Sequence, residues 1–183
     1  MSKSVLVPIA DGTEEIEAVC LIDVLRRAGV SVTVASVDGL EVTASRGVRL
    51  VAEQLIADCV DDTYDVIALP GGMPGAEHLR DSKYLERLLK RQQREGRLYA
   101  AICASPVVVL QHHGLLGQRR ATCHPDFVHQ LENTDAVEER VVVDGPCVTS
   151  RGPGTAIEFA LKLVELLYDG QKAKEIAQRM VVA

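Results

Sequence analysis

Short apolar runs alternate with amphipathic segments along the chain. Runs of apolar and β-branched residues predict strands, because a strand covered on both faces needs no polar alternation. The predicted strands are residues 5–9, 31–37, 64–69 and 98–102. Segments with apolar positions three or four residues apart predict helices that cover a sheet. The predicted helices are residues 13–28, 83–95, 153–168 and 172–180, and one more that begins near residue 104.

The remaining segments predict shorter elements. They are a small hairpin over 41–50, a short helix over 52–59, a short strand over 121–124 and paired strands over 141–143 and 147–150. Strands that alternate with helices need crossover connections, so the order predicts an α/β fold: a mostly parallel sheet with helices on both faces. No linker, repeat or low-complexity tract is present, so residues 1–183 are predicted to form one domain.

Composition narrows the class of protein. The chain has 183 residues and a net charge of −6 without a basic run, which argues against a nucleic-acid partner held through phosphate contacts. No segment approaches the roughly 18 consecutive apolar residues of a membrane span. Five cysteines at wide spacings, without a Cys-x-x-Cys pair, disfavour a disulfide framework or a zinc site. We therefore predict a cytoplasmic protein with reduced thiols and with neither a metal nor another cofactor.

Cys103 is the first candidate for chemistry. It lies where the predicted strand 98–102 turns into a helix. The N–H groups and the positive dipole end of that helix favour a thiolate, which is the nucleophilic form of cysteine. The alternative is that Cys103 is a small core residue, because free cysteine is among the most buried residue types.

Glu17 is the second candidate. At 100° per residue it shares a helix face with Leu21, Val24 and Ala28, whereas Glu15 points away and is expected to be solvated. Burial raises the pKa of a carboxyl group, so one proton shared between Glu17 and a nearby thiol would favour the thiolate. The alternative is a carboxylate at the helix end that reaches solvent.

The opposite side of the first predicted helix is also apolar. Val19 and Ile22 lie roughly opposite Glu17. A helix that is apolar all round is usually covered on both sides. One cover is the sheet, and the other is predicted to be a second copy of the chain, which gives a homodimer through this helix.

Two further features end predicted strands at the same edge of the sheet. His124 precedes Pro125, and a histidine there can accept a proton near neutral pH, although a lone histidine is more often structural. Gly71 and Gly72 form either a tight turn or a cradle of N–H groups for an anion. No Gly-Lys-Ser/Thr follows them and no Gly-x-Gly-x-x-Gly is present, so nucleotide-binding loops are disfavoured.

Cys123 would point away from Cys103 and is a poor resolving cysteine.

Four motifs together resemble the ThiJ/PfpI superfamily, within it the branch of the parkinsonism-associated deglycase and its YajL-like bacterial relatives. They are Glu14-Glu15-Ile16-Glu17, Leu69-Pro70-Gly71-Gly72, Ala100-Ala101-Ile102-Cys103-Ala104 and Thr149-Ser150-Arg151-Gly152-Pro153-Gly154-Thr155. The resemblance covers essentially the whole chain, in order and at similar spacing.

The resemblance implies a flavodoxin-like α/β sandwich that forms a homodimer. Cys103 matches the cysteine of the family's nucleophile elbow, Glu17 the carboxyl group bonded to it, and His124 a nearby histidine. The N–H groups of Gly72 and Ala104, beside Gly71, match an oxyanion pocket. Arg46 resembles an arginine near the site and the dimer contact, and Arg27 is a weaker candidate of the same kind.

The resemblance also implies an activity. Such proteins are described as glyoxalases that convert methylglyoxal to lactate without glutathione and as deglycases of glycated proteins and nucleotides. They are also described as oxidative-stress sensors or chaperones, which leaves a redox-sensing role of Cys103 with little turnover as the alternative. Ala104 follows the cysteine where the protease branch has histidine, so proteolysis is disfavoured. A glutamine-amidotransferase role is disfavoured because His124-Pro125-Asp126 is a poor copy of the required histidine–carboxylate pair. Ser105, the third residue of the elbow, stands where glycine or alanine is usual in the family.

Overall fold

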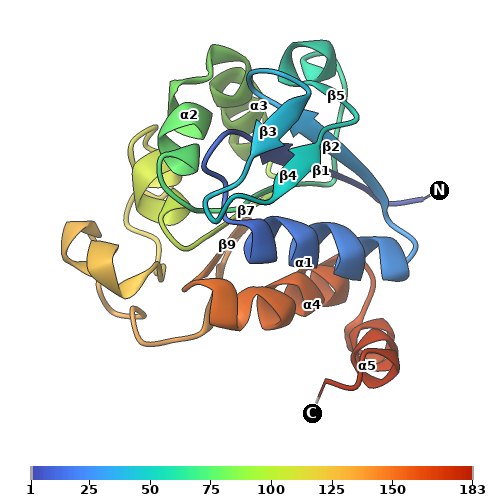
Figure 1. Ribbon diagram of the computed structural model, residues 1–183. Helices are drawn as coiled ribbons and strands as arrows, with labels where there is room; N and C mark the ends of the chain where they lie inside the picture. Colours follow the sequence, from blue (N-terminus) through green and yellow to red (C-terminus); the bar gives the residue numbers. More distant parts are fainter. Residues whose placement is uncertain (1, 183) are drawn as a thin grey trace.

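The computed structural model describes residues 2–182 and has a seven-stranded sheet at its centre (Figure 1). The strand order is β5-β2-β1-β6-β7-β9-β8, and every neighbouring pair is parallel except β8 with β9. The strands are β1 (Ser4–Ile9), β2 (Ser31–Ser36), β5 (Gln54–Leu55), β6 (Val66–Leu69), β7 (Leu98–Ile102), β8 (Val141–Asp144) and β9 (Cys147–Ser150). A separate antiparallel hairpin pairs β3 (Glu41–Thr43) with β4 (Arg49–Val51).

Helices cover both faces of the sheet. On one face α1 (Glu15–Arg27) lies beside α4 (Ala156–Leu167), and α5 (Gly170–Arg179) packs against α4 (Figure 1). On the other face lie α2 (Gly75–Asp81), α3 (Lys83–Arg94) and a π-helical segment, Pro106–Gln111. Short 3₁₀ turns are Ile56–Cys59, Pro125–Gln130 and Pro153–Thr155.

The sheet divides the interior into two hydrophobic cores. Val5, Val7 and Ile9 of β1 belong to the core under α1 and α4, whereas Leu6 belongs to the core under α2 and α3. This alternation follows from the two-residue period of a strand, and it leaves β1 buried on both faces. The predicted α/β sandwich with a mostly parallel sheet is therefore confirmed.

Three predictions of local structure were wrong or incomplete. Residues 121–124 form no strand, because β7 and β9 are already paired on both edges; His124 N–H donates instead to the Cys103 carbonyl at 2.8 Å. Residues 52–59 form β5 and a 3₁₀ turn rather than one helix. Helix α2 was missed because its start lies in a run of glycine and proline that predicts only a turn.

No helix in the described part of the chain, residues 2–182, has the length and apolar character to cross a membrane. The predicted hairpin over 41–50 is present and lies next to the start of α1, above it in the view of Figure 1. Two backbone hydrogen bonds join the hairpin to the segment before α1. Gly12 N–H donates to the Thr43 carbonyl (2.8 Å), and Ser45 N–H donates to the Thr13 carbonyl (2.8 Å). The hairpin is thereby held against the first turn of α1.

Candidate active site

Cys103 follows β7 at the edge of the sheet where the carboxyl ends of the parallel strands meet. Its backbone has a φ of 67°, in the left-handed region that a residue with a Cβ rarely adopts. The conformation is fixed by the bond from Cys103 N–H to the Ser150 carbonyl (3.1 Å) and by the His124 bond to its own carbonyl. A sharp strand-to-helix turn of this kind is a nucleophile elbow, which presents the side chain above the sheet.

Glu17 lies beside this sulfur. Its side chain is fully buried, in the stripe that contains Leu21 and Val24. Its Oε2 accepts a hydrogen bond from Gly71 N–H at 2.7 Å. Its Oε1 is buried and has no hydrogen-bond partner among residues 2–182. The carboxyl group as a whole is a neighbour of the Cys103 thiol. The carboxyl group is thus removed from water, and no cationic side chain in the described part of the chain neutralises it.

Burial sets the ionisation of this pair. Burial raises the pKa of Glu17 from its ordinary 4.5 to about 7, against the lowering effect of Gly71 N–H. Burial, and then the charge of Glu17, raises the pKa of Cys103 to about 12, while the N–H groups of Gly72 and Ala104 lower it. The sequence predicted that the helix end and a shared proton with Glu17 favour the thiolate, but the pKa of Cys103 is raised, because the pattern did not show the depth of the sulfur. Between these two values the pair holds one proton.

Gly71 and Gly72 bring the end of β6 against the elbow. A Cβ on Gly71 would lie 2.5 Å from the Cβ of Cys103 and 3.0 Å from Glu17 Oε2, so only glycine allows this approach. Gly72 has a φ of 88°, which glycine adopts without strain. The backbone N–H groups of Gly72 and Ala104 are hydrogen-bonding neighbours of the sulfur, as an anion pocket requires.

A cavity of about 480 Å³ opens above the sulfur. Its wall includes Cys103, Ala104, Gly72, His124 and Arg46, so the structure brings these predicted residues together. The His124 side chain is 35% exposed, and its Nδ1 lies 3.5 Å from the Asp126 carboxylate. Arg46 is exposed on the hairpin turn. Arg27 forms an ion pair with Asp23 on the outside of α1, and it is not among the residues that line the cavity.

Glu15 corrects a prediction. It was expected to be solvated, but it is only 7% exposed, because the β3–β4 hairpin folds over the start of α1. Its carboxylate accepts bonds from Ser45 Oγ (2.9 Å) and Arg46 N–H (2.8 Å). Burial favours a higher pKa for Glu15, yet these bonds outweigh burial and lower it. Glu15 therefore holds the turn that carries Arg46, and no pattern in the sequence could have shown this contact between distant segments.

Ser105 makes the other contact that the sequence did not reveal. Its side chain is fully buried, and its hydroxyl donates to the Pro70 carbonyl at 2.6 Å. The bond joins the elbow to the end of β6. The only signal in the sequence was the departure from glycine or alanine at this position.

The comparisons with known proteins agree with this geometry. The model of the DJ-1/PfpI family matches residues 3–166. The chain belongs to the DJ-1/PfpI family. The predicted resemblance is thereby confirmed.

Individual members of the DJ-1/PfpI family are similar over the whole chain. The structure of oxidized Toxoplasma gondii DJ-1 is 53% identical, covers 100% of both chains and has a TM-score of 0.97. Protein DJ-1 homolog B of Arabidopsis thaliana is 49% identical over 99% of this chain, but the chain spans only 42% of that protein's length. A Caenorhabditis elegans protein named glutathione-independent glyoxalase DJR-1.2 is 36% identical over 100% of this chain and 97% of its own length.

Across residues 2–182, no group of three or more His, Cys, Asp or Glu side chains is placed to hold a metal ion. The described cysteines are all free thiols: Cys20, Cys59, Cys103, Cys123 and Cys147.

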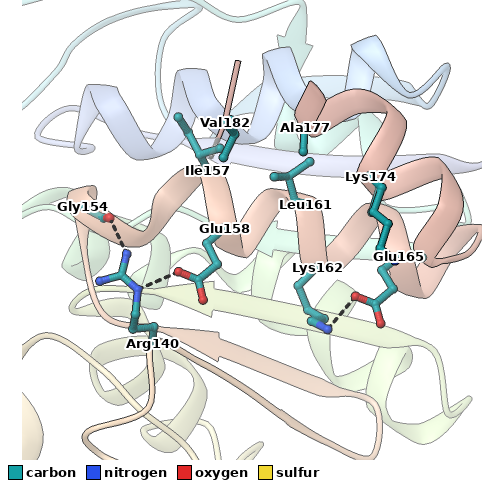
Figure 2. A pocket seen from close by; sticks show the side chains of 12 residues that line it. Arg140, Gly154, Ile157, Glu158, Leu161, Lys162, Glu165, Lys174, Ala177 and Val182 are labelled. Carbon is teal, nitrogen blue, oxygen red and sulfur yellow. Dashed lines mark hydrogen bonds and ion pairs between the residues drawn. The ribbon is translucent and has the colours of Figure 1, made fainter. Parts of the chain in front are cut away.

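A larger hollow, of about 870 Å³, lies away from this site between α4 and α5 (Figure 2). Ile157 and Leu161 form its apolar floor. Four of its charged side chains form two ion pairs: Arg140 Nε lies 2.7 Å from Glu158 Oε2, and Lys162 Nζ lies 2.6 Å from Glu165 Oε2. It presents no buried acid and no thiol.

Proposed function

We propose that the chain is a cysteine-dependent glyoxalase or deglycase, acting on methylglyoxal or on glycated protein and nucleotide adducts. The observation that carries the proposal is the buried Glu17–Cys103 pair beneath a cavity lined by Gly72 and Ala104. The similar Caenorhabditis elegans protein, named a glutathione-independent glyoxalase, supports it. The five free thiols are consistent with a cytoplasmic location, because that compartment keeps thiols reduced.

The reactive form of the pair is the thiolate with Glu17 protonated. In this form the repulsion that raises the thiol pKa is absent and the carboxyl group is a donor. The thiolate adds to the aldehyde carbon of methylglyoxal, and the N–H groups of Gly72 and Ala104 stabilise the oxyanion. Glu17 gives this oxygen its proton, so a hemithioacetal forms and Glu17 becomes a carboxylate.

The second half of the reaction uses Glu17 as a base. The carboxylate removes the hydrogen from the former aldehyde carbon and returns it to the adjacent carbonyl carbon, while the hydroxyl proton passes to the oxygen of that carbonyl. The product is a thioester of lactate on Cys103. Water attacks the thioester, lactate leaves and the thiol is regenerated, so that methylglyoxal and one water give lactic acid. His124, at the cavity wall, is placed to activate this water.

Lactate production from methylglyoxal without glutathione tests the proposal. The parent is expected to form lactate, and Cys103→Ser should fall to background because serine is a far weaker nucleophile. Cys20→Ser is the control, since Cys20 is a free thiol on α1 outside the cavity. Equal rates in the parent and Cys103→Ser would refute the enzymatic role.

A second candidate is a redox sensor. The buried Oε1 of Glu17 would, when protonated, donate a hydrogen bond to a sulfinate on Cys103. The similar Toxoplasma gondii protein has been solved in an oxidized form. Peroxide followed by intact and peptide mass spectrometry tests the role: a gain of two oxygen atoms confined to Cys103, with negligible lactate formation, is expected. Equal oxidation of Cys20 would count against it.

The proposed homodimer would bury the outer face of α1. Ile16 is 53% and Val19 48% exposed there, which is unusual for large apolar side chains that neighbour each other on one helix. Sedimentation equilibrium is expected to give twice the chain mass, and Val19→Glu is expected to shift it towards the single chain. A parent that sediments as a monomer at micromolar concentration would refute the dimer.

A further inference from the structure

One peptide group connects Ser105 to Glu17. The Pro70 carbonyl accepts the Ser105 hydroxyl at 2.6 Å, and the N–H of the same peptide group, on Gly71, donates to Glu17 Oε2 at 2.7 Å. Ser105, Gly71 and Glu17 are all buried. The three groups therefore form a continuous hydrogen-bonded chain without access to bulk water.

Hydrogen bonds in such a chain strengthen each other. A donor on an amide oxygen polarises the amide and makes its N–H a better donor, by about 10–30% per bond. The strengthened N–H favours the ionised form of the carboxyl group that accepts it. The serine hydroxyl can thus act on the Glu17 carboxyl group although the two side chains are joined only through the backbone.

We propose that Ser105 is a positioning residue that tunes the proton affinity of Glu17 through the Pro70–Gly71 peptide. The hydroxyl also fixes the orientation of this peptide, because no other side chain among the described residues donates to the Pro70 carbonyl. The serine at this position is therefore a means of setting where the single proton of the Glu17–Cys103 pair lies. The inference stands on the Glu17–Cys103 geometry and applies to the proposed function, which uses that pair.

Several titratable groups face Glu17 and remain unchanged when Ser105 is replaced. Those around the carboxyl group are Glu14 at the N-cap of α1, Cys20 on α1 and Cys103 on the elbow. Those further out, in the cavity, are Arg46 on the hairpin, His124 just before the 3₁₀ turn and Asp126 within it. Because a substitution of Ser105 changes none of these charges, a change in the Glu17 titration reports the hydrogen-bonded peptide.

The experiment is a direct titration of the Glu17 carboxyl carbon by ¹³C NMR in the glutamate-labelled chain of 183 residues. All samples carry Cys103→Ala so that the carboxyl group titrates alone, and Glu17→Gln assigns its signal. Ser105→Ala is expected to raise the Glu17 pKa by about half a unit, a roughly threefold change in its dissociation constant. Ser105→Thr, which keeps the hydroxyl, is expected to retain the parental value.

Ser36→Ala is the matched control. Ser36 is equally buried, and its hydroxyl bonds to Asp38 N–H rather than to the Pro70–Gly71 peptide. An unchanged Glu17 pKa in Ser105→Ala, or an equal rise in Ser36→Ala, would overturn the proposal. If Ser105→Ala does not fold, Ser105→Cys, with its weaker S–H donor, is expected to give a rise in the same direction. Because the readout is a pKa and not turnover, its result is independent of whether the chain makes lactate.

Discussion

The two hollows of the molecule differ in size and in chemistry. The groove between α4 and α5 has about 870 Å³, whereas the cavity above Cys103 has about 480 Å³. In the groove, Glu158 is 51% exposed and lies 2.7 Å from Arg140. Beside the cavity, Glu17 is fully buried, and no cationic side chain among residues 2–182 acts on it. The comparison indicates that chemical reactivity depends on an ionisable group that is removed from water. The volume of a hollow does not indicate whether it contains such a group.

The largest expected effect is on the rate of turnover, which should depend on Glu17 and not on Glu158. Glu17→Gln removes the proposed acid and base and is expected to lower lactate formation by about 10²–10⁴-fold. Glu158→Gln removes an exposed carboxylate of the groove and is expected to stay within twofold. Steady-state rates of lactate formation measure both. A loss of similar size in Glu158→Gln would assign a role to the groove.

The next effect compares Gly71, behind Cys103, with Gly170 in the groove between α4 and α5. Gly71→Ala would place its Cβ 2.5 Å from the Cβ of Cys103 and 2.9 Å from the Ile102 carbonyl. The overpacking is expected to lower the free energy of unfolding by about 3 kcal/mol. Gly170→Ala, at the start of α5 in the groove, meets no atom within 4 Å and is expected to be neutral or slightly stabilising. Urea unfolding measures both, and equal changes would contradict the close approach at Gly71.

The pH dependence of stability gives a third comparison. Because the Glu17 pKa is raised from 4.5 to about 7, the folded state binds the proton more tightly, so this contribution to stability is present at low pH and is lost between these values. Between pH 5.5 and 8 the parent is expected to lose about 2 kcal/mol from this group. Urea unfolding of Glu17→Gln should lack that loss, whereas Glu158→Gln should retain it. A loss that persists in Glu17→Gln would show that another group causes it.

The smallest effect concerns the ion pair of the groove. Arg140→Met is expected to change the free energy of unfolding by at most about 0.5–1 kcal/mol, because both Arg140 and Glu158 are more than half exposed. Thermal unfolding in low and high salt measures it. A destabilisation of about 2 kcal/mol or more would mean that the groove is held together more tightly than its exposure indicates.

The carboxyl groups of the first turn of α1 show how much of the site could be predicted from the sequence. The burial of Glu17 followed from its place in an apolar helical stripe, which is a local property. The burial of Glu15 did not, because it depends on a hairpin whose turn, at Ser45 and Arg46, lies 30 residues further along the chain. The direction of the Cys103 pKa was missed for the same reason, since depth below the surface is set by segments from several strands.

The sequence by itself determined the alternation of strands and helices, the parallel sheet and the edge at which Cys103, Gly71 and Gly72 meet. These features follow from periodicity and from glycine and proline, which act over a few residues. Only the tertiary structure decided which groups share one proton and which peptide connects Ser105 to Glu17. Desolvation and hydrogen-bond partners depend on distances between segments that are far apart in the chain, and no local pattern encodes those distances.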